Sequence, residues 1–477
     1  MIRTRLFATA AALLVFGVAV DAHAGGFYYT DRGVRPMGRG GAFVAGADDL
    51  NAAWYNPAGL AEAGSSLFLD LAWVNQTTEF TRKAQVIDGS GTVQTYGYPT
   101  VKGTSPFLTI PMLGGSYNFG QKKEFTVALA TTAPYSSLIT YPVTVDGQPA
   151  ASRYSAISLD GTALLRTGAY FAYKPIPQFR IGVGLEAVLG AFQSTLMFGA
   201  APPDRLVSAP EDPNYDTLSQ LKGGPIFAPT GSLGVQVIPE KHIAFGLSGQ
   251  LPTTISTNAA VKVRLPNAAP FDKAYQEGDQ ANVRMKLPAV LRVGAEFRQD
   301  MSQDMALRVE LAYVREFWSA HESIDIRSEN IKLYNLTGFP SPFGVAPISL
   351  PRNFQDSNSF RLGGELRTMA GSTPISLRLG GSYDTSAIPL AYVSPLTTDA
   401  DKIVVTAGAG VHLLESKLRI DMHIAKPFAP DLFVPPGEAK VPRVNPVQGN
   451  PTQSEAINGG NYVVSTLIIG LGANYKF

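Results

Sequence analysis

The sequence contains no cysteine. It therefore has no disulfide framework, no thiolate chemistry and no cysteine-ligated metal. Charge is also scarce, because Asp, Glu, Lys and Arg together make up 16% of the chain and the formal net charge is only +1. A chain this close to neutral lacks the electrostatic attraction that binds nucleic acids, so we predict no nucleic-acid partner.

Long hydrophobic runs are missing except at the amino terminus. Two arginines precede an apolar run from Leu6 to Val20, and Ala22-His23-Ala24 fits the small-x-small pattern before a cleavage point. The alternative, a membrane-anchoring helix, would need about 20 apolar residues, which is longer than this run. We therefore predict that residues 1–24 are a secretory signal peptide and that the mature chain starts at Gly25.

The carboxyl-terminal segment Val463–Phe477 alternates between two kinds of residue. Its large apolar face carries Leu467, Ile469, Leu471, Ala473 and Tyr475, and the opposite face is mostly small or polar. Alternate side chains of a strand point to opposite faces, so this pattern is typical of a strand with one face in lipid and the other in a lumen. A chain that ends on such a strand, at a phenylalanine, is typical of a bacterial outer-membrane barrel.

Turns and loops follow the same arrangement along the chain. Short polar turns are expected at residues 120–123, 174–178, 239–241, 299–305, 368–373 and 415–417. Long loops are expected at about residues 77–105, 134–160, 199–228, 253–282, 317–355, 385–401 and 427–461. In outer-membrane barrels the short turns lie at the periplasmic end and the long loops at the outer end, and the same assignment is expected here. The pattern predicts an all-β fold, a 14-stranded antiparallel transmembrane β-barrel over residues 65–477.

The segment Gly25–Gly64 does not fit the barrel pattern. It is rich in glycine and alanine and has too little bulky apolar surface to form a core of its own. The lumen of a fourteen-stranded barrel is too wide for the side chains of its wall to fill. We therefore predict that residues 25–64 form an N-terminal hatch that plugs the lumen.

The hatch sequence resembles a known family. The stretch Arg39–Ala61, and above all Asn56-Pro57-Ala58, resembles the hatch of the FadL-type outer-membrane transporters, which carry long-chain fatty acids and aromatic hydrocarbons. Further similarity lies in Gly380-Gly381-Ser382-Tyr383-Asp384 and in the carboxyl-terminal strand. The resemblance implies a monomer in the bacterial cell outer membrane. A hydrophobic small molecule would be captured at the outer loops, hatch movement would follow, and the ligand would leave sideways through the barrel wall.

In this family the lateral gap is linked to a kink in the third strand. The corresponding strand here is Phe125–Thr132, followed by Ala133 and Pro134. Proline has no N–H for a ladder hydrogen bond, so a local break in pairing is one interpretation of Pro134. The other is that Pro134 merely ends the strand at the loop. Ala133 and Pro134 are the candidates for the wall opening.

Two further groups of residues are candidates for ligand contact. Apolar residues of the predicted outer loops are candidates for capture, namely Phe227, Leu333, Phe339 and Phe343. They either pack on each other as a lid or form an apolar landing groove. Inward-facing arginines are candidates for binding a ligand carboxylate, namely Arg308, Arg361 and Arg378. The alternative for them is a structural network of Arg–carboxylate pairs that holds the hatch.

Asn56 and Pro57 have a structural and a functional interpretation. Pro57 favours an extended Asn56, whose side chain can cap the next turn, and the pair can also anchor a movable hatch. The adjacent acids Asp48 and Asp49 are a weak signal for a cation, so we predict no metal. Neither a Gly-x-Ser-x-Gly nor a His-Glu-x-x-His motif occurs, and we predict neither enzyme activity nor a cofactor.

The expected function is passive uptake of hydrophobic molecules, with outer-membrane lipid around the barrel. Two alternatives stay open. One is a general porin for small polar solutes, and the other is an outer-membrane adhesin or receptor. An apolar route is favoured because exposing an alkyl chain to water costs about 0.8 kcal/mol per CH₂.

Overall fold

The computed structural model describes residues 31–87, 90–105, 108–135, 139–159, 161–201, 211–447 and 456–477. The predicted signal peptide and the first residues of the predicted hatch lie outside these ranges. No helix among the described residues is both long and apolar enough to cross a membrane.

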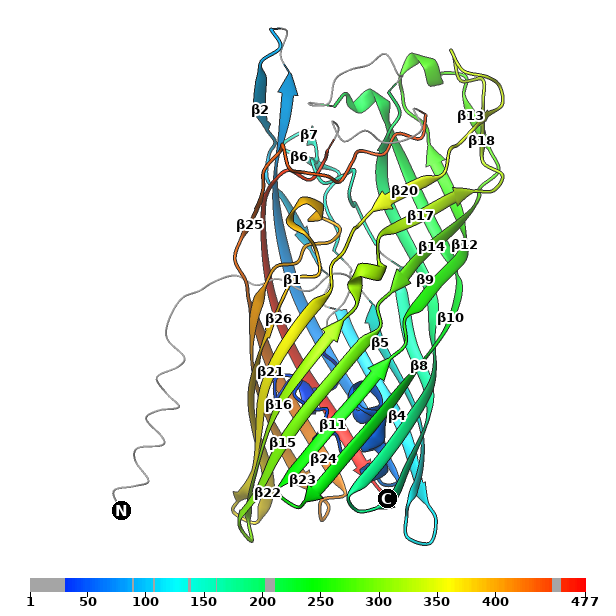
Figure 1. Ribbon diagram of the computed structural model, residues 1–477. Helices are drawn as coiled ribbons and strands as arrows, with labels where there is room; N and C mark the ends of the chain where they lie inside the picture. Colours follow the sequence, from blue (N-terminus) through cyan, green and yellow to red (C-terminus); the bar gives the residue numbers. More distant parts are fainter. Residues whose placement is uncertain are drawn as a thin grey trace.

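The wall is a closed antiparallel sheet of fourteen strands (Figure 1). Ten of them are single elements: β1 (Ser66–Ile87), β4 (Leu108–Phe119), β5 (Phe125–Tyr135), β8 (Ala163–Ile176), β9 (Phe179–Gly199), β10 (Asp216–Glu240), β22 (Thr373–Asp384), β23 (Lys402–Leu413), β24 (Leu418–Phe428) and β26 (Gly460–Lys476). The barrel closes where β1 pairs with β26, from Ser66 opposite Lys476 up to Arg82 opposite Gly460. The predicted barrel is thus confirmed.

Four neighbouring wall strands are each broken into a lower and an upper piece. The pairs are β11 (Ile243–Gln250) with β12 (Thr253–Arg264), β15 (Val290–Ser302) with β14 (Gln280–Leu287), β16 (Met305–Glu316) with β17 (Ser323–Ser328), and β21 (Ser357–Ala370) with β20 (Ile348–Pro351). Lower pieces pair with lower pieces and upper with upper, so the breaks lie side by side. Pro252 and Pro288, which cannot donate to a ladder, occupy two of them.

The breaks separate two kinds of outer surface. Below them the outer face is apolar, with exposed Phe245, Leu247, Leu291, Val293, Leu311, Phe360 and Leu362. On the upper pieces of these four strands the exposed residues are polar or charged, such as Ser256, Asn258 and Arg284. Because a barrel presents its apolar band to lipid, the breaks mark the outer edge of the membrane-spanning part.

Shorter elements complete the fold. The outer end carries β2 (Val93–Gly97), β3 (Val101–Thr104), β6 (Thr144–Val145), β7 (Gln148–Pro149), β13 (Tyr275–Glu277), β18 (Lys332–Tyr334), β19 (Phe343–Gly344), β25 (Leu432–Val434), η2 (Pro213–Tyr215), η3 (Ala269–Phe271), η4 (Trp318–Ala320) and η5 (Leu390–Tyr392). All six predicted short turns lie between consecutive strands at the opposite end of the barrel.

Several predicted loops were too long, because the strands of the upper wall extend into them. The loop predicted at 199–228 ends at Asp216, where β10 begins.

The segment before β1 lies inside the lower part of the barrel (Figure 1). It contains α2 (Val34–Met37), α3 (Ala52–Tyr55) and η1 (Pro57–Glu62), and nearly all of its described residues are buried. Glycines of the wall make room for it. A Cβ on Gly182 or Gly234 would come within 2.3 Å of Pro57 or 2.0 Å of Asn56, respectively. The described part of the predicted hatch therefore lies within the lumen.

Candidate functional site

A cavity of about 230 Å³ lies inside the upper wall, above the level of the breaks. Most of its lining is aliphatic or aromatic, and the inward-facing residues of β9, β10, β12, β14 and β17 supply much of it. Representative side chains are Phe192, Leu196, Leu221, Val261, Val283, Met285, Ile324 and Ile326. The cavity can hold an apolar ligand out of contact with water.

Arg352 is the one charged side chain among the described residues that line this cavity. It follows β20 at the break in the wall, is 3% exposed, and forms no ion pair with a described carboxylate. Its Nε atom has no hydrogen-bond partner, and burial lowers the pKa of the guanidinium to about 10. Arg352 therefore stays cationic at neutral pH and is poised to meet a buried anion.

His321 lies near Arg352 and does not compensate its charge. Its Nδ1 atom is 2.7 Å from the carbonyl oxygen of Lys286. Burial, with a smaller contribution from the charge of Arg352, lowers the pKa of His321 to about 4. The imidazole is therefore neutral at physiological pH, and Arg352 is left as the positive centre of an apolar chamber.

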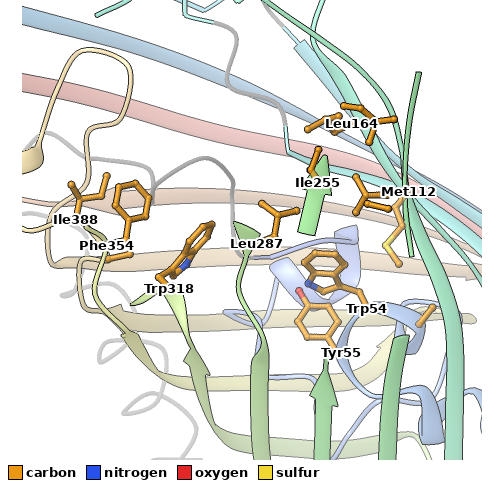
Figure 2. Close-up of a cluster of buried hydrophobic side chains, with 14 of the residues drawn as sticks. Trp54, Tyr55, Met112, Leu164, Ile255, Leu287, Trp318, Phe354 and Ile388 are labelled. Atoms are coloured by element: carbon orange, nitrogen blue, oxygen red, sulfur yellow. The ribbon is translucent and has the colours of Figure 1, made fainter. Parts of the chain in front are cut away.

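An apolar cluster connects the cavity with the hatch. Figure 2 shows Leu287 between Trp318, at the break in the wall, and Trp54 of the hatch. Leu164 and Leu287 belong to this cluster and also line the cavity. Met112 of β4 belongs to it as well. Apolar side chains thus extend without interruption from the lining of the cavity to the hatch.

The apolar cluster reaches the part of the wall formed by β4 and β5. Met112 also borders a void of about 10 Å³ beside Met37 of the hatch and Ile110 of β4. A small apolar cluster that includes Met37 and Ile110 packs against Ala133. The predicted opening candidate Ala133 therefore packs against a cluster to which the hatch contributes Met37.

The pairing of β5 breaks at the predicted place. Its ladder with β4 ends where Met112 faces Thr132, and the described residues continue no further along that seam. On the other side, the register with β8 shifts between Thr132 and Tyr135. Pro134 lies within β5, in the stretch where the register shifts, which agrees with the interpretation of a local break in pairing. Whether ligands pass through this break stays a prediction.

Asn56 joins the hatch to the wall. Its Nδ2 atom donates to the carbonyl oxygens of Val44 at 3.0 Å and Val235 at 3.1 Å. Its Oδ1 atom accepts a hydrogen bond from Ala58 N at 3.1 Å, and its backbone is extended, with φ −159° and ψ 103°. Pro57 begins η1 directly after it. The predicted cap is confirmed, and Asn56 also carries a long-range contact that the sequence did not reveal.

Two wall side chains hold the hatch loop 44–47. Glu310 accepts hydrogen bonds from three successive backbone N–H groups, those of Val44, Ala45 and Gly46, at 2.6, 2.9 and 2.9 Å. Gln236 donates to the carbonyl oxygens of the same loop, including that of Ala47 at 2.9 Å. Neither side chain is distinctive in the sequence, because inward polar residues are general in barrels.

The three predicted carboxylate-binding arginines are all paired with acids, two of them with acids of the hatch. Arg308 donates to Asp48 at 2.5 Å and to Glu296 at 2.8 Å. Arg361 pairs with Asp31. Arg378 donates to Glu365 at 2.6 Å and to Asp421 at 2.8 Å.

These pairs correspond to the predicted structural network. Arg35 and Arg39 of the hatch extend it, at 2.9 Å from Glu365 and 2.7 Å from Glu296. Asp48 and Asp49 are likewise paired with arginines. No group of three or more His, Asp or Glu side chains suited to a metal occurs among the described residues.

The predicted capture residues divide into two groups. Leu333, Phe339 and Phe343 pack together with Phe271 in one outer-loop cluster, and Leu333 also lines the cavity. This mutual packing is what the interpretation as a lid expects. Phe227 was wrongly placed in a loop. It lies in β10 opposite Leu189 and is 72% exposed on the outside of the barrel.

An ion-pair latch ties the outer loops to the wall. Glu211, before β10, accepts from Arg82 of β1 at 2.6 Å and from the hydroxyl of Tyr98 at 2.7 Å. Burial would raise the pKa of Glu211, but the charge and hydrogen bond of Arg82 and the hydrogen bond of Tyr98 hold it at about 2. The latch was not foreseen, since its members lie far apart in the sequence.

The comparisons with known proteins agree with this architecture. The family described as outer membrane protein transport protein (OMPP1/FadL/TodX) matches residues 15–477. A FadL homologue from Pseudomonas aeruginosa has a similar structure, with TM-score 0.68, 14% identity, and coverage of 96% of this chain and 100% of that one. The toluene transporters TodX of P. putida (0.60, 14%, 96% and 99%) and TbuX of Ralstonia pickettii (0.57, 15%, 94% and 99%) are also similar. No curated protein matches the sequence.

Proposed function

Since the chain belongs to the OMPP1/FadL/TodX family of outer-membrane transport proteins, we propose that its cavity binds an amphipathic acid, an apolar chain that ends in a carboxylate. The observation that carries this proposal is Arg352, a buried and unpaired cation in a largely apolar chamber. A carboxylate that entered the chamber would find a planar guanidinium as its partner, and the chain would lie against the aliphatic lining. Long-chain fatty acids have this chemistry.

The energetic argument favours a dry route over a water-filled pore. Transferring an alkyl chain from an apolar site into water costs about 0.8 kcal/mol per CH₂, or roughly ten kcal/mol for a long-chain acid. The cluster from Leu287 through Trp54 to Met112 supports a path on which that cost is avoided. The proposed sequence of events is capture under the lid, binding in the cavity, movement of the hatch, and exit beside Pro134.

Monoaromatic hydrocarbons are the second candidate substrates. Two similar structures are toluene transporters, and the cavity includes aromatic side chains such as Phe192 and Phe271. A neutral hydrocarbon would make no use of the charge of Arg352. The two substrate classes therefore differ in their dependence on this one side chain.

The experiment is uptake of radiolabelled oleate and of toluene by cells in which this protein is the only outer-membrane channel of its kind. We expect saturable oleate uptake that exceeds that of cells without the protein. Toluene uptake without oleate uptake would replace the fatty-acid proposal with the hydrocarbon one. Uptake of neither, with entry of small polar solutes instead, would refute hydrophobic transport by this cavity.

A further inference from the structure

The outer face of the upper wall carries a group of basic residues. They lie on the adjacent strands β10, β12, β14 and β17 and are all exposed: Lys222, Lys262, Arg264, Arg284, Lys286 and Arg327. We call this group the cationic face. It belongs to the same strands whose inward side chains line the cavity.

The alternation along β14 fixes which way these side chains point. Val283 and Met285 line the cavity, so Arg284 and Lys286 project to the outside. Packing of the apolar core therefore accounts for the inward residues only. It gives no reason for cations at the outward positions.

Register brings the basic residues of neighbouring strands together. Arg284 faces Ser256 on one side, and on the other side Arg327 faces Asn282, two residues from Arg284. Such diagonal neighbours are within reach of long side chains. On the next seam Lys262 faces Gln220, and Lys222 lies two residues further along β10.

Acidic side chains do not neutralise this face. Among the described residues, no carboxylate lies within ion-pair distance of any of the six cations. Asp325 faces Arg284 across the ladder, but its Oδ1 atom already accepts from the hydroxyls of Ser323 and Ser349 at 2.9 and 2.7 Å.

Two exposed cations elsewhere on the barrel are paired. Lys102 lies 2.7 Å from Glu79, and Arg315 lies 2.9 Å from Asp356. The cationic face gathers six cations without an ion pair on four adjacent strands, where the facing Asp325 is a single acid, so it carries an excess of positive charge. Such a charge attracts an anionic partner.

The height of the cationic face above the membrane points to the partner. The face begins directly above the breaks, and below them the exposed side chains of Leu291, Val293 and Leu311 face lipid. It therefore lies at the level of the headgroups of the outer leaflet, which in a bacterial outer membrane belong to a glycolipid with phosphorylated sugars. Arg and Lys are suited to phosphate, Arg as a bidentate donor.

We propose that the cationic face binds the phosphorylated headgroup of the outer-leaflet glycolipid, lipopolysaccharide. The acyl chains of this lipid lie against the apolar band below, and its phosphates contact the basic residues above. The contact fixes the height of the barrel and keeps a lipid molecule against the outside of the cavity wall. It is independent of the substrate proposed above, because Arg352 is not part of it.

The test compares the amount of glycolipid that stays with the purified protein. The triple variant R284E/K286E/R327E reverses three charges of the face, and R315E reverses a cation that is already paired. Bound glycolipid per barrel is measured by mass spectrometry after gentle detergent extraction. We expect at least a fivefold loss in the triple variant and less than a twofold change in R315E. Equal retention by all three proteins would overturn the proposal.

A second measurement separates headgroup recognition from adhesion of acyl chains. The purified protein, freed of lipid, is titrated with lipid A that carries two phosphates and with its dephosphorylated form. Preference for the phosphorylated lipid by the natural protein, lost in R284Q/K286Q/R327Q, supports the proposal. Equal binding of both lipids, or complete displacement of lipid A by equimolar inorganic pyrophosphate, would refute it. An unchanged thermal transition shows that a variant is folded.

Discussion

The side-chain amide of Asn56 donates a hydrogen bond to the carbonyl oxygen of Val235, 3.1 Å away on wall strand β10. This bond runs from a plug segment to the barrel that surrounds it. The same side chain fixes Val44 and Ala58 within the plug. One residue therefore sets both the shape of the hatch and its attachment.

Replacing Asn56 by alanine should loosen the hatch without unfolding the barrel. N56A leaves the carbonyl of Val235 and the amide of Ala58 without their partners, and each buried unpaired group costs about 1–3 kcal/mol. Hydrogen exchange of residues 44–58 should become at least tenfold faster. The matched control is N258A on the exposed outer face of β12, where exchange of the hatch should stay as in the natural protein.

Arg352 should discriminate between the two substrate classes. R352L removes the cation from the cavity, so binding of oleate should weaken by about tenfold or more, the value of one charge-assisted hydrogen bond. Binding of toluene should change less than threefold, because the lining stays apolar. R352K should restore part of the oleate affinity. The measurement is calorimetric titration of the purified protein, and equal losses for both ligands would mean that Arg352 only supports the fold.

Pro134 should be needed for exit and not for binding. P134V provides an N–H that can extend the ladder between β4 and β5 and close the break. We expect oleate uptake to fall at least fivefold while its affinity for the cavity is retained. P229V is a suitable control, because Pro229 lies in a continuous part of the β9–β10 ladder, opposite Ala187. Unchanged uptake in P134V would place the exit elsewhere.

The outer latch should open in acid. The folded pKa of Glu211 is about 2, below its ordinary value of 4.5, so its contribution is fully present above pH 4.5 and is lost as the pH falls toward 2. E211Q should already lack most of this contribution at pH 7. Proteolysis of the loop around residue 211, measured from pH 6 to 3, should accelerate in the natural protein and stay flat in E211Q.

Much of the fold could be predicted because strands and turns are local. The alternation in Val463–Phe477 and the six polar turns required only neighbouring residues. The upper wall was harder to predict from the sequence. Its strands follow breaks at Pro252 and Pro288, which interrupt the period of two and resemble the start of a loop. Phe227 was misplaced for a related reason, since the register of β10 shifts between Gly223 and Ile226.

The candidate site was harder to predict than the fold. Asn56 was recognisable because a proline follows it, and capping is a local effect. Arg352 lies in an irregular stretch, where nothing in the sequence separates it from any exposed arginine. Its importance arises from what surrounds it, namely residues contributed by many strands. The same holds for Glu211, whose partners Arg82 and Tyr98 are more than a hundred positions away.

The ion pairs around the hatch share their carboxylates, and this has a consequence for movement. Glu365 accepts from Arg35 of the hatch and from Arg378 of the wall, while Asp49 of the hatch is paired with Arg35 and with Arg419 of the wall. If the hatch slides away, Glu365 keeps Arg378 and Asp49 keeps Arg35. Neither of these two acids is left bare, so the penalty of about 3–5 kcal/mol for a stranded buried charge is avoided for them. Glu310 of the wall differs, because Arg39 and the three backbone N–H groups that bind it all belong to the hatch. A shift of the plug is therefore resisted at this one carboxylate and not at the shared ones.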